Sequence, residues 1–447
     1  MIRPMKAALV IAAMLTLSSH AHAAPSASEI GRQVARDLVE NRVAAVVSRM
    51  SPTMAAALPE AKLAAVWAQL IQTSGKPREL GEPSSETMDG FVVVRVPLTF
   101  DAGKLDLKLS LASDLIVGLF IVSHEDKAAA WTPPAYADPA KFQEVDIKLG
   151  SGPMPLPGTL SLPRGVTKAP AVILVHGSGP QDRDEAIGPN KVFRDLAFGL
   201  ASRGIAVLRY EKRTRVYPAS FAGLKDATVK EEVLDDVDLA VAFLRGRPEI
   251  DPDRIAVLGH SLGGTLAPRI AAANPAVARI AILAGATRPL PDIIVEQTEY
   301  LAGLSGPIDE TKARSIEAMK KDAARARAAK VGDEGSPFLG VPLSYWADLN
   351  AYDPALAAAA VKIPVLVLQG GRDYQVTRED FRRFETALHG RDDAFLYVLP
   401  DLNHLFMAGT GRSTPAEYQI PAHIAEPVIN LVAGFLLAPA TAKAGSP

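Results

Sequence analysis

The sequence predicts an α/β fold, in which a mainly parallel sheet with helices on both faces follows a small α+β domain. One observation is a series of apolar, strand-like runs that alternate with helix-like segments such as Val229 to Arg245. These runs begin at Ala171, Ile205, Ile255, Ile280, Ile363 and Ala394. A second observation is the interval between Ala284 and Ile363, which is much longer than one crossover helix and predicts an inserted lid at about residues 288–350.

The runs Phe142 to Leu149 and Gly158 to Leu162 come before this series and predict an antiparallel hairpin at one edge of the sheet. We therefore expect the large domain to span residues 142–438. Residues 126–141 are rich in proline, as in Trp131-Thr132-Pro133-Pro134, and predict a stiff linker in front of that domain.

Residues 24–125 have a different pattern, which predicts the small α+β domain. From Ser28 to about Leu70 the apolar residues recur at helical spacing. Three strand-like runs follow, at Phe91 to Phe100, Lys104 to Leu111 and Leu115 to Val122. These apolar positions are most simply core, and this region holds no cluster of residues suited to catalysis.

Residues 1–23 have the features of a signal peptide. Arg3 and Lys6 precede an apolar stretch from Ala7 to Leu17, and Ala21-His22-Ala23 forms a small-residue cleavage site. The apolar stretch is too short to span a bilayer comfortably, and the chain has no cysteine that could carry a lipid anchor. We expect a periplasmic or secreted protein that is cleaved near Ala23 and has no stable membrane anchor.

The composition excludes several classes of function. The chain has 48 Lys and Arg against 50 Asp and Glu, a net charge of −2, which gives no electrostatic case for nucleic-acid binding. The absence of cysteine excludes disulfides, iron–sulfur clusters, cysteine-ligated zinc and a thiol nucleophile. The eight histidines show no HExxH-like spacing, so we expect no catalytic metal and no other cofactor.

The clearest chemical motif is Gly259-His260-Ser261-Leu262-Gly263-Gly264, which has the form of a nucleophile elbow. A strand-like run from Arg254 to Leu258 leads into it, and a helix-like stretch from Leu262 to Ala273 follows. Small residues beside the serine allow the strained turn, and the helix adds the partial positive charge of its N-terminus. The motif therefore predicts Ser261 as a nucleophile.

A serine nucleophile needs a general base and an orienting acid, which follow an elbow in the order acid, then histidine. The buried run Ile363 to Gln369 ends at Gly370-Gly371-Arg372-Asp373, at the edge of the sheet where ligand-facing residues lie. Asp373 is the predicted acid, since the helix that follows already has Thr377 as a plausible cap. His404 is the predicted base, because it directly follows the last strand-like run, Ala394 to Leu399.

Two other histidines also follow the acid. His389 lies at the end of an amphipathic helix just before Gly390, a common place for a surface histidine. His423 comes later in the chain, and neither residue directly follows a strand.

Attack on a carbonyl also needs donors for the developing oxyanion. The run Ala171 to Val175 leads into His176-Gly177-Ser178-Gly179-Pro180, a loop suited to supply one backbone N–H. We predict the N–H groups of Ser178 and Leu262 as the two donors, with Gly179 as the alternative to Ser178.

Taken together, these motifs resemble the α/β-hydrolase superfamily. The strings are His176-Gly177-Ser178-Gly179, Gly259-His260-Ser261-Leu262-Gly263, Gly370-Gly371-Arg372-Asp373 and Asn403-His404. The string from Gln369 to Val376 resembles a bacterial esterase branch in which a small N-terminal domain of poorly understood role precedes the hydrolase. Met50 to Met54, Leu58 to Glu60 and Leu63 to Leu70 resemble that N-terminal domain. The resemblance implies an α/β-hydrolase catalytic domain that hydrolyses carboxylic esters with short or simple acyl groups.

One segment departs from the family pattern. After the strand Ile205 to Arg209, related enzymes often carry a glycine-containing Asp-x-Arg-Gly-type turn. This chain has Tyr210-Glu211-Lys212-Arg213-Thr214 there, which leaves that side of the pocket undefined.

The sequence thus predicts a secreted serine hydrolase that cleaves small-molecule esters through an acyl-enzyme. Two alternatives stay open, a peptidase or aminopeptidase with the same triad and a non-catalytic binding module of the same fold. The oligomeric state is open as well.

In the lid, residues 312–330 hold seven Lys and Arg, which indicates a solvated helix face more than a site for an anionic substrate. The lid also holds four apolar or aromatic residues, Phe338, Leu339, Tyr345 and Trp346. They indicate either an apolar entrance to the site or packing of the lid onto the core.

Overall fold

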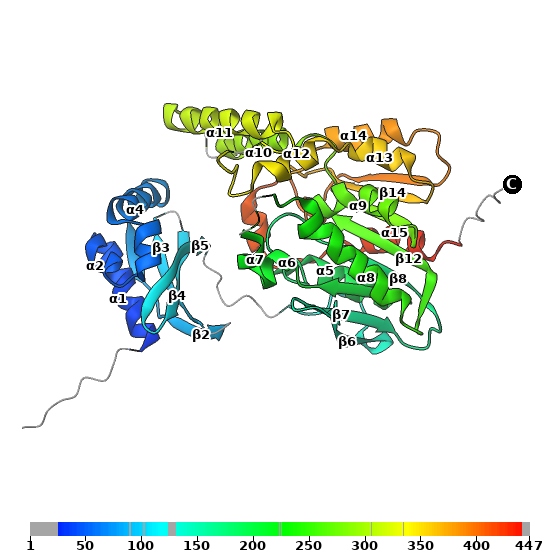
Figure 1. The fold of residues 1–447 in the computed structure, drawn as a ribbon, viewed down its shortest axis with the longest axis horizontal. Coiled ribbons are helices and arrows are strands. Elements are labelled where there is room, and N and C mark those ends of the chain that lie inside the picture. The colour runs from blue at the N-terminus through cyan, green and yellow to red at the C-terminus, as the bar shows by residue number, and fades with distance from the viewer. Residues whose placement is uncertain are drawn as a thin grey trace, which may run out of the picture. The chain divides into compact units, whose positions relative to one another are not determined.

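The computed structural model describes residues 26–88, 91–101, 103–123, 131–222, 224, 226–304, 306–333 and 335–439. The predicted signal peptide lies outside these residues. The chain divides into two compact units, Met1–Asp126 and Lys127–Pro447 (Figure 1). Within the described residues, none of the helices combines the length and the apolar character that crossing a bilayer requires.

The first unit packs helices on an antiparallel sheet. Its elements are α1 (Ala27–Val39), α2 (Val43–Val47), α3 (Pro52–Ala57), α4 (Glu60–Ser74), β1 (Pro77–Leu80), β2 (Ser84–Met88), β3 (Phe91–Phe100), β4 (Gly103–Ala112) and β5 (Leu115–Ser123). The strand order is β1-β3-β4-β5, and β2 also pairs with β3. Val34 and Leu38 of α1 are buried against Val94 and Val96 of β3. This α+β arrangement agrees with the predicted one, with β1 and β2 in addition.

The second unit is built on an eight-stranded sheet with the order β15-β14-β13-β12-β8-β11-β7-β6. Its strands are β6 (Phe142–Leu149), β7 (Leu156–Pro163), β8 (Ala169–Val175), β11 (Ala206–Tyr210), β12 (Ile250–His260), β13 (Val277–Leu283), β14 (Val365–Gly370) and β15 (Ala394–Leu399). The strands from β8 onward run parallel, while β6 and β7 form an antiparallel hairpin at one edge. The predicted mainly parallel sheet and its edge hairpin are confirmed.

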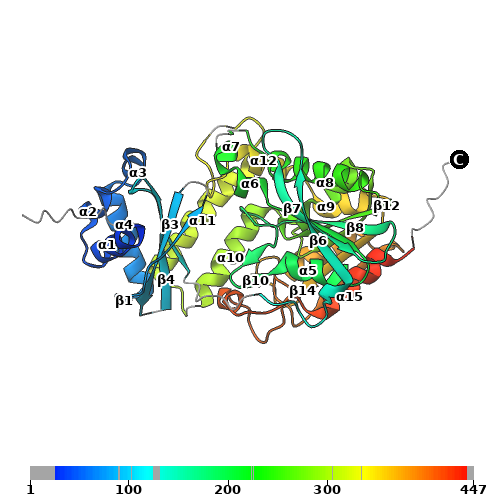
Figure 2. The same ribbon diagram turned by 90° about the horizontal axis from the view of Figure 1, so that it is seen from below.

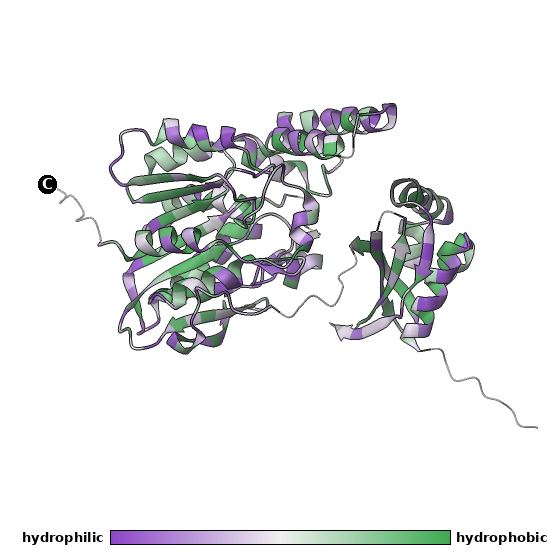
Figure 3. Cartoon of the chain, turned by 180° about the vertical axis from the view of Figure 1, so that it is seen from behind, coloured by the Kyte–Doolittle hydropathy of each residue, from purple (hydrophilic) through white to green (hydrophobic). Residues whose placement is uncertain are grey.

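Helices cover both faces of this sheet. Those of the second unit are α5 (Val192–Ala201), α6 (Arg213–Val216), α7 (Pro218–Ala222), α8 (Asp235–Arg245), α9 (Leu262–Ala273), α10 (Leu290–Leu304), α11 (Glu310–Ala328), α12 (Leu343–Asn350), α13 (Pro354–Ala360), α14 (Arg378–Ala387) and α15 (Glu426–Leu437). Along β8, Ile173 belongs to the core with α8, α9, α13 and α14, whereas Val172 and Leu174 belong to the core with α5 and α15. Both faces of the inner strands are buried, and strands such as β8 and β13 are accordingly almost continuously apolar (Figure 3).

Short elements connect these layers. They are the two-stranded ribbon of β9 (Ala186–Ile187) and β10 (Asn190–Lys191), the one-turn helices Pro139–Lys141 and Pro415–Gln419, and the π-helical turn Lys230–Leu234. The ribbon follows β8 and precedes α5, which places it in the connection that leaves the end of a central strand.

The predicted lid corresponds to helices inserted between β13 and β14, of which α10 and α11 lie side by side (Figure 2). Phe338, Tyr345 and Trp346 are buried at 2%, 6% and 5% exposure, whereas Leu339 is exposed. Three of the four aromatic or apolar residues therefore pack the insert onto the core. In α11 the charged residues are mostly exposed, and Lys320 pairs with Glu299 and Glu317, as expected for a solvated helix face.

The described part of the predicted linker packs on the second unit. The Trp131 ring lies edge-on to Phe198 of α5 with 4.9 Å between ring centroids, and its indole N–H donates to Asp195 at 2.8 Å. The backbone N–H of Asp138 donates to the Ser202 hydroxyl. Residues 131–141 therefore form part of the packing of α5.

Candidate active site

The predicted nucleophile lies at a strained turn between β12 and α9. Ser261 has φ 53° and ψ −117°, a backbone conformation that costs a non-glycine residue about 1–3 kcal/mol. Its N–H donates to the carbonyl oxygen of Leu283, and its own carbonyl accepts the N–H of Thr265, both at 2.9 Å. A Cβ at Gly263 would lie 2.1 Å from the carbonyl oxygen of Val175. Only glycine fits there, so the flanking glycines allow the turn to approach β8.

The structure brings the predicted acid and base together. Asp373 follows β14, His404 follows β15, and the Nδ1 of His404 lies 2.7 Å from Oδ2 of Asp373. The other carboxylate oxygen, Oδ1, accepts the backbone N–H groups of Gln375 (2.8 Å) and Val376 (3.0 Å). Both side chains are buried, with Asp373 at 7% and His404 at 4% exposure. These contacts orient the carboxylate toward the imidazole.

A tight loop positions His404 beside the elbow. The Oδ1 of Asn403 accepts the N–H groups of Leu405 (3.0 Å) and Met407 (3.1 Å), which holds the chain on either side of the histidine. The carbonyl oxygen of His404 accepts a hydrogen bond from Nε2 of His260, at 2.9 Å. Since His260 directly precedes Ser261, this bond ties the histidine loop to the residue beside the predicted nucleophile.

The other two histidines that follow the acid lie in different settings. His389 is exposed just after α14. His423 is 3.0 Å from the Asp195 carboxylate, whose second oxygen accepts the N–H of Ile424 at 2.9 Å. Neither is hydrogen-bonded to Asp373.

The loop predicted to supply an oxyanion donor lies against the elbow. A Cβ at Gly177 would lie 3.3 Å from Cβ of Ser261. The N–H of Gly177 already donates to Oε1 of Glu185 at 2.7 Å, so the next amides, those of Ser178 and Gly179, are the candidates. Leu262 begins α9, where the first N–H groups have no partner within the helix.

A buried ion pair that the sequence analysis did not identify joins these segments. The Nδ1 of His260 lies 2.9 Å from Oε2 of Glu185, and the side chains are 2% and 1% exposed. Burial works to lower the pKa of His260, but the Glu185 carboxylate outweighs it and raises this pKa above its ordinary value. Burial works to raise the pKa of Glu185, but the charge of His260 holds it below its usual range. Glu185 thus connects Gly177 with His260, and His260 connects the elbow with His404.

His176 has a different electrostatic setting. It is fully enclosed, and burial lowers its pKa to about 4, so the ring is neutral near pH 7. Its Nε2 is 3.0 Å from the carbonyl oxygen of Asp182, to which it donates. His176 is therefore a structural residue of this loop.

A second buried pair lies in the segment that departs from the family pattern. The Nζ of Lys212, which is 2% exposed, donates to the carbonyl oxygen of Gly177 at 2.8 Å. It also pairs with Oε1 of Glu232 at 2.5 Å, and the Tyr345 hydroxyl donates to the other Glu232 oxygen at 2.6 Å. Sequence reasoning marked this segment only as a departure, because nothing local indicates that the ammonium reaches the oxyanion loop.

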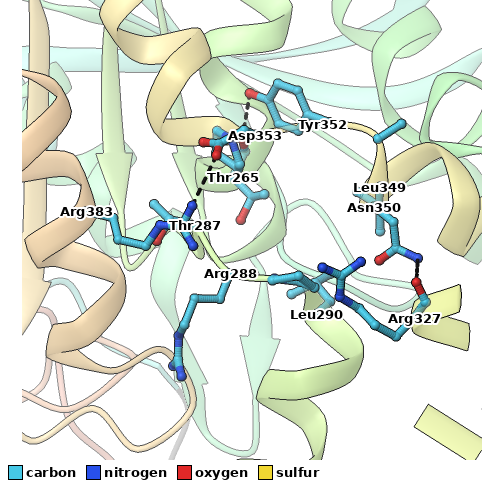
Figure 4. A pocket seen from close by; sticks show the side chains of 13 residues that line it. Thr265, Thr287, Arg288, Leu290, Arg327, Leu349, Asn350, Tyr352, Asp353 and Arg383 are labelled. Carbon is cyan, nitrogen blue, oxygen red and sulfur yellow. Dashed lines mark hydrogen bonds and ion pairs between the residues drawn. The ribbon is translucent and has the colours of Figure 1, made fainter. Parts of the chain in front are cut away.

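A cavity of about 210 Å³ lies beside α9, at the insert (Figure 4). It is lined by Thr265, Thr287, Arg288, Pro289, Leu290, Arg327, Leu349, Asn350, Ala351, Tyr352, Asp353, Pro354 and Arg383. Each arginine has a carboxylate partner: Arg288 pairs with Asp380, Arg327 with Asp292 and Arg383 with Asp353. The cavity therefore offers no unpaired arginine to an anionic ligand. Across the described part of the chain, no group of His, Asp and Glu side chains is arranged to hold a metal ion.

Comparison with known proteins shows which family the chain resembles in sequence. Residues 172–418 match the model of the alpha/beta hydrolase family, and residues 32–119 match a model described as a protein of unknown function, DUF3887. The chain is 35% identical over 403 residues to Esterase EstD of Thermotoga maritima. The aligned region covers 90% of this chain and 93% of that protein. A thiohydrolase of Arthrinium phaeospermum is 25% identical over 127 residues, 27% of this chain and 37% of that protein.

Among solved structures, Est1E from Butyrivibrio proteoclasticus matches with a TM-score of 0.43 and 18% identity over 65% of this chain and 97% of that one. The family model spans more than half of the sequence, and the esterase of Thermotoga maritima matches nearly all of it. The chain therefore belongs to the alpha/beta hydrolase family.

Proposed function

We propose that this protein is a carboxylic ester hydrolase with Ser261 as nucleophile, His404 as general base and Asp373 as orienting acid. The observation that carries the proposal is the buried 2.7 Å hydrogen bond between Asp373 and His404. The carbonyl oxygen of His404 is in turn hydrogen-bonded to His260, the residue beside Ser261. Further support comes from the match to Esterase EstD along most of the chain.

In the proposed mechanism, Oγ of Ser261 attacks the ester carbonyl carbon while Nε2 of His404 takes the hydroxyl proton. Asp373 accepts the Nδ1–H of His404, which selects the tautomer and stabilises the imidazolium. The N–H groups of Ser178 and Leu262 bind the oxyanion. His404 then gives its proton to the leaving alcohol, and an acyl-enzyme remains. Water, deprotonated by His404, attacks this acyl group, and the carboxylic acid leaves as Ser261 recovers its proton.

The substrates we propose are esters with short or simple acyl groups, on the resemblance of the string from Gln369 to Val376 to a bacterial esterase branch. A p-nitrophenyl ester series from acetate to palmitate, assayed with the purified protein and with Ser261→Ala, tests both points. We expect turnover to be highest on the short esters. We expect kcat to fall by a factor on the order of 10⁵ or more in the variant, because the nucleophile is lost.

An amino-acid anilide serves as the control substrate in the same assay. Cleavage of the anilide with no cleavage of any ester would favour the peptidase alternative. Inertness toward both would favour a binding module, and full esterase activity of Ser261→Ala would exclude this serine as the nucleophile.

We also propose that the protein is exported and cleaved near Ala23, on the sequence features of residues 1–23. N-terminal sequencing of the protein recovered from the periplasm or medium should begin near Ala24. A chain that stays in the cytoplasm and keeps Met1 would contradict export.

A further inference from the structure

The peptide group between Gly177 and Ser178 connects Lys212 with the proposed oxyanion hole, and the inference drawn from it rests on the proposed function. The carbonyl of Gly177 and the N–H of Ser178 belong to the same planar amide and point in opposite directions. Whatever holds the oxygen of this amide therefore also sets the direction of its N–H.

Buried charged groups hold Gly177 on both sides. Its carbonyl oxygen accepts a hydrogen bond from the Lys212 ammonium at 2.8 Å, and its N–H donates to the Glu185 carboxylate at 2.7 Å. Hydrogen bonds with one ionised partner are roughly twice as strong as those between neutral groups. Gly177 itself lies against Ser261. The loop is therefore held rigidly at the place where it meets the nucleophile.

The sign of the charge suits an oxyanion. An ammonium at the carbonyl oxygen draws electron density toward that oxygen and leaves the N–H of the same amide more positive. Such polarisation is stronger in a protein interior than in water, because the surroundings screen the charge less. A more positive Ser178 N–H would stabilise the negative charge that develops on the ester oxygen.

Stability alone does not explain a buried lysine here. Replacing a buried ion pair with apolar residues of similar size is often neutral or stabilising, because two charges lose their hydration. Lys212 is 2% exposed and its partner Glu232 side chain is 6% exposed. The carboxylate of Glu232 is also held by the Tyr345 hydroxyl of α12, so the pair is fixed from the insert as well.

We propose that Lys212 is a positioning residue of the oxyanion hole. Its ammonium orients and polarises the Gly177–Ser178 amide, and this makes the Ser178 N–H, not that of Gly179, the oxyanion donor. Lys212 does not touch the substrate and acts through this one peptide group.

The test compares Glu232→Gln with the double variant Lys212→Met/Glu232→Gln in the full-length protein. Both lack the ion pair, and neither leaves an unpaired buried carboxylate at position 232, as Lys212→Met alone would. Only the first keeps the ammonium at Gly177. We measure kcat and KM on p-nitrophenyl acetate, the inhibition constant of phenylboronic acid and the midpoint of thermal unfolding. The boronic acid forms a tetrahedral adduct with a serine, and one oxygen of the adduct occupies the oxyanion hole.

We expect kcat of the double variant to be about 10- to 100-fold below that of Glu232→Gln, since loss of a whole oxyanion donor costs about 10²- to 10³-fold. KM should change less than kcat, and the inhibition constant of the boronic acid should rise in parallel with the loss of kcat. Equal kcat in the two variants would overturn the proposal. So would a fall in kcat and in the unfolding midpoint with no change in boronic acid binding, which a merely structural role would produce.

The wild type and Ser261→Ala are assayed alongside. Wild-type ester turnover that does not depend on Ser261 would mean that the proposed function has failed. That outcome is distinct from failure of the proposal on Lys212. The proposal on Lys212 is judged only by comparing Glu232→Gln with Lys212→Met/Glu232→Gln.

Discussion

At the scale of single residues, the carboxylate of Asp373 explains how a histidine on a loop is held in one orientation. One of its oxygens accepts two backbone N–H groups of the turn that follows β14, and the other accepts Nδ1–H of His404. The side-chain amide of Gln369 donates a fourth hydrogen bond, from Nε2 to Oδ2 of Asp373, at 3.2 Å. The carboxylate therefore occupies Nδ1 of His404, and Nε2 is the nitrogen that we propose as the base.

We predict that Asp373→Asn lowers kcat by about 10⁴-fold, because an amide in place of the carboxylate favours the wrong tautomer of His404. Steady-state kinetics on a short p-nitrophenyl ester measures the effect. Asp401→Asn is the matched control, since Asp401 is exposed in the turn just before His404 and should leave kcat within about twofold. A kcat for Asp373→Asn above a tenth of the wild-type value would show that another group orients His404.

We expect the pair of Glu185 and His260 to make the stability of the fold depend on pH. Because the pKa of His260 in the folded protein is raised above 6.5, its contribution is complete below about pH 6.5 and is lost as the pH rises through the folded value. The pKa of Glu185 is lowered below 4.5, so its contribution is complete above about pH 4.5 and is lost as the pH falls through the folded value.

We therefore predict that the unfolding midpoint of the wild type exceeds that of Glu185→Gln most between about pH 4.5 and 6.5. The difference should shrink as the pH is raised toward 9. Thermal unfolding of both proteins across this range gives the measurement. A difference that stays constant or grows with pH would contradict the ion pair.

At the scale of elements, the elbow depends on close contact between α9 and the end of β8. Gly263 lies in the first turn of α9, where a Cβ would be 2.1 Å from the carbonyl oxygen of Val175 and 2.8 Å from that of His176. At Gly263, α9 and the end of β8 therefore approach through backbone atoms.

We predict that Gly263→Ala lowers the unfolding midpoint and kcat together, because α9 must shift away from β8. The matched control is Gly434→Ala in α15, where a Cβ meets no atom within 4 Å. There alanine should stabilise the helix by about 0.5–1 kcal/mol. Thermal unfolding and kinetics of both variants distinguish the two cases, and a Gly263→Ala protein as stable and active as the wild type would show that the contact can relax.

Most elements follow from local sequence. The strands β3, β8 and β15 agree with continuous or alternating apolar runs, and α9 agrees with the stretch after the elbow. The strands β1 and β2 were not predicted, because Pro-Arg-Glu-Leu and Ser-Ser-Glu-Thr-Met are short and largely polar and pair only along β3. Their formation depends on a neighbouring strand and not on a pattern of their own.

The candidate site likewise contains some residues that a local sequence pattern predicts and others that it does not. Ser261, Asp373 and His404 stand out because each directly follows a strand-like run, in an order that the elbow predicts. Glu185 and Lys212 do not stand out in the sequence. The partner of Glu185 is His260 and that of Lys212 is Gly177, and both partners lie far away in the chain. Buried polar networks that join distant segments leave no local pattern, and only the folded arrangement reveals them.

At the scale of the whole molecule, every residue of the candidate site lies in the unit Lys127–Pro447. Met1–Asp126 forms a separate unit, and its described residues have a core of their own that includes Ile30, Leu38 and Leu98. The chemistry and the N-terminal unit therefore belong to different parts of the chain.

We predict that a chain beginning at Lys127 folds and hydrolyses short p-nitrophenyl esters with a kcat within about threefold of the full-length value, since none of the triad or oxyanion residues is removed. Expression and kinetics of this truncated protein provide the test. Loss of activity in a truncated protein that still unfolds cooperatively would assign the first unit a part in catalysis.

The most direct measurement is the reaction of the full-length protein with a fluorophosphonate, followed by mass spectrometry of its peptides. An activated serine attacks the phosphorus and displaces fluoride, which leaves a stable adduct on that residue. We predict one adduct, on Ser261, whose formation is strongly slowed in His404→Ala and parallels the loss of ester hydrolysis. Ester hydrolysis that continues while Ser261 stays unmodified, or an adduct on another residue that abolishes it, would contradict the proposed triad.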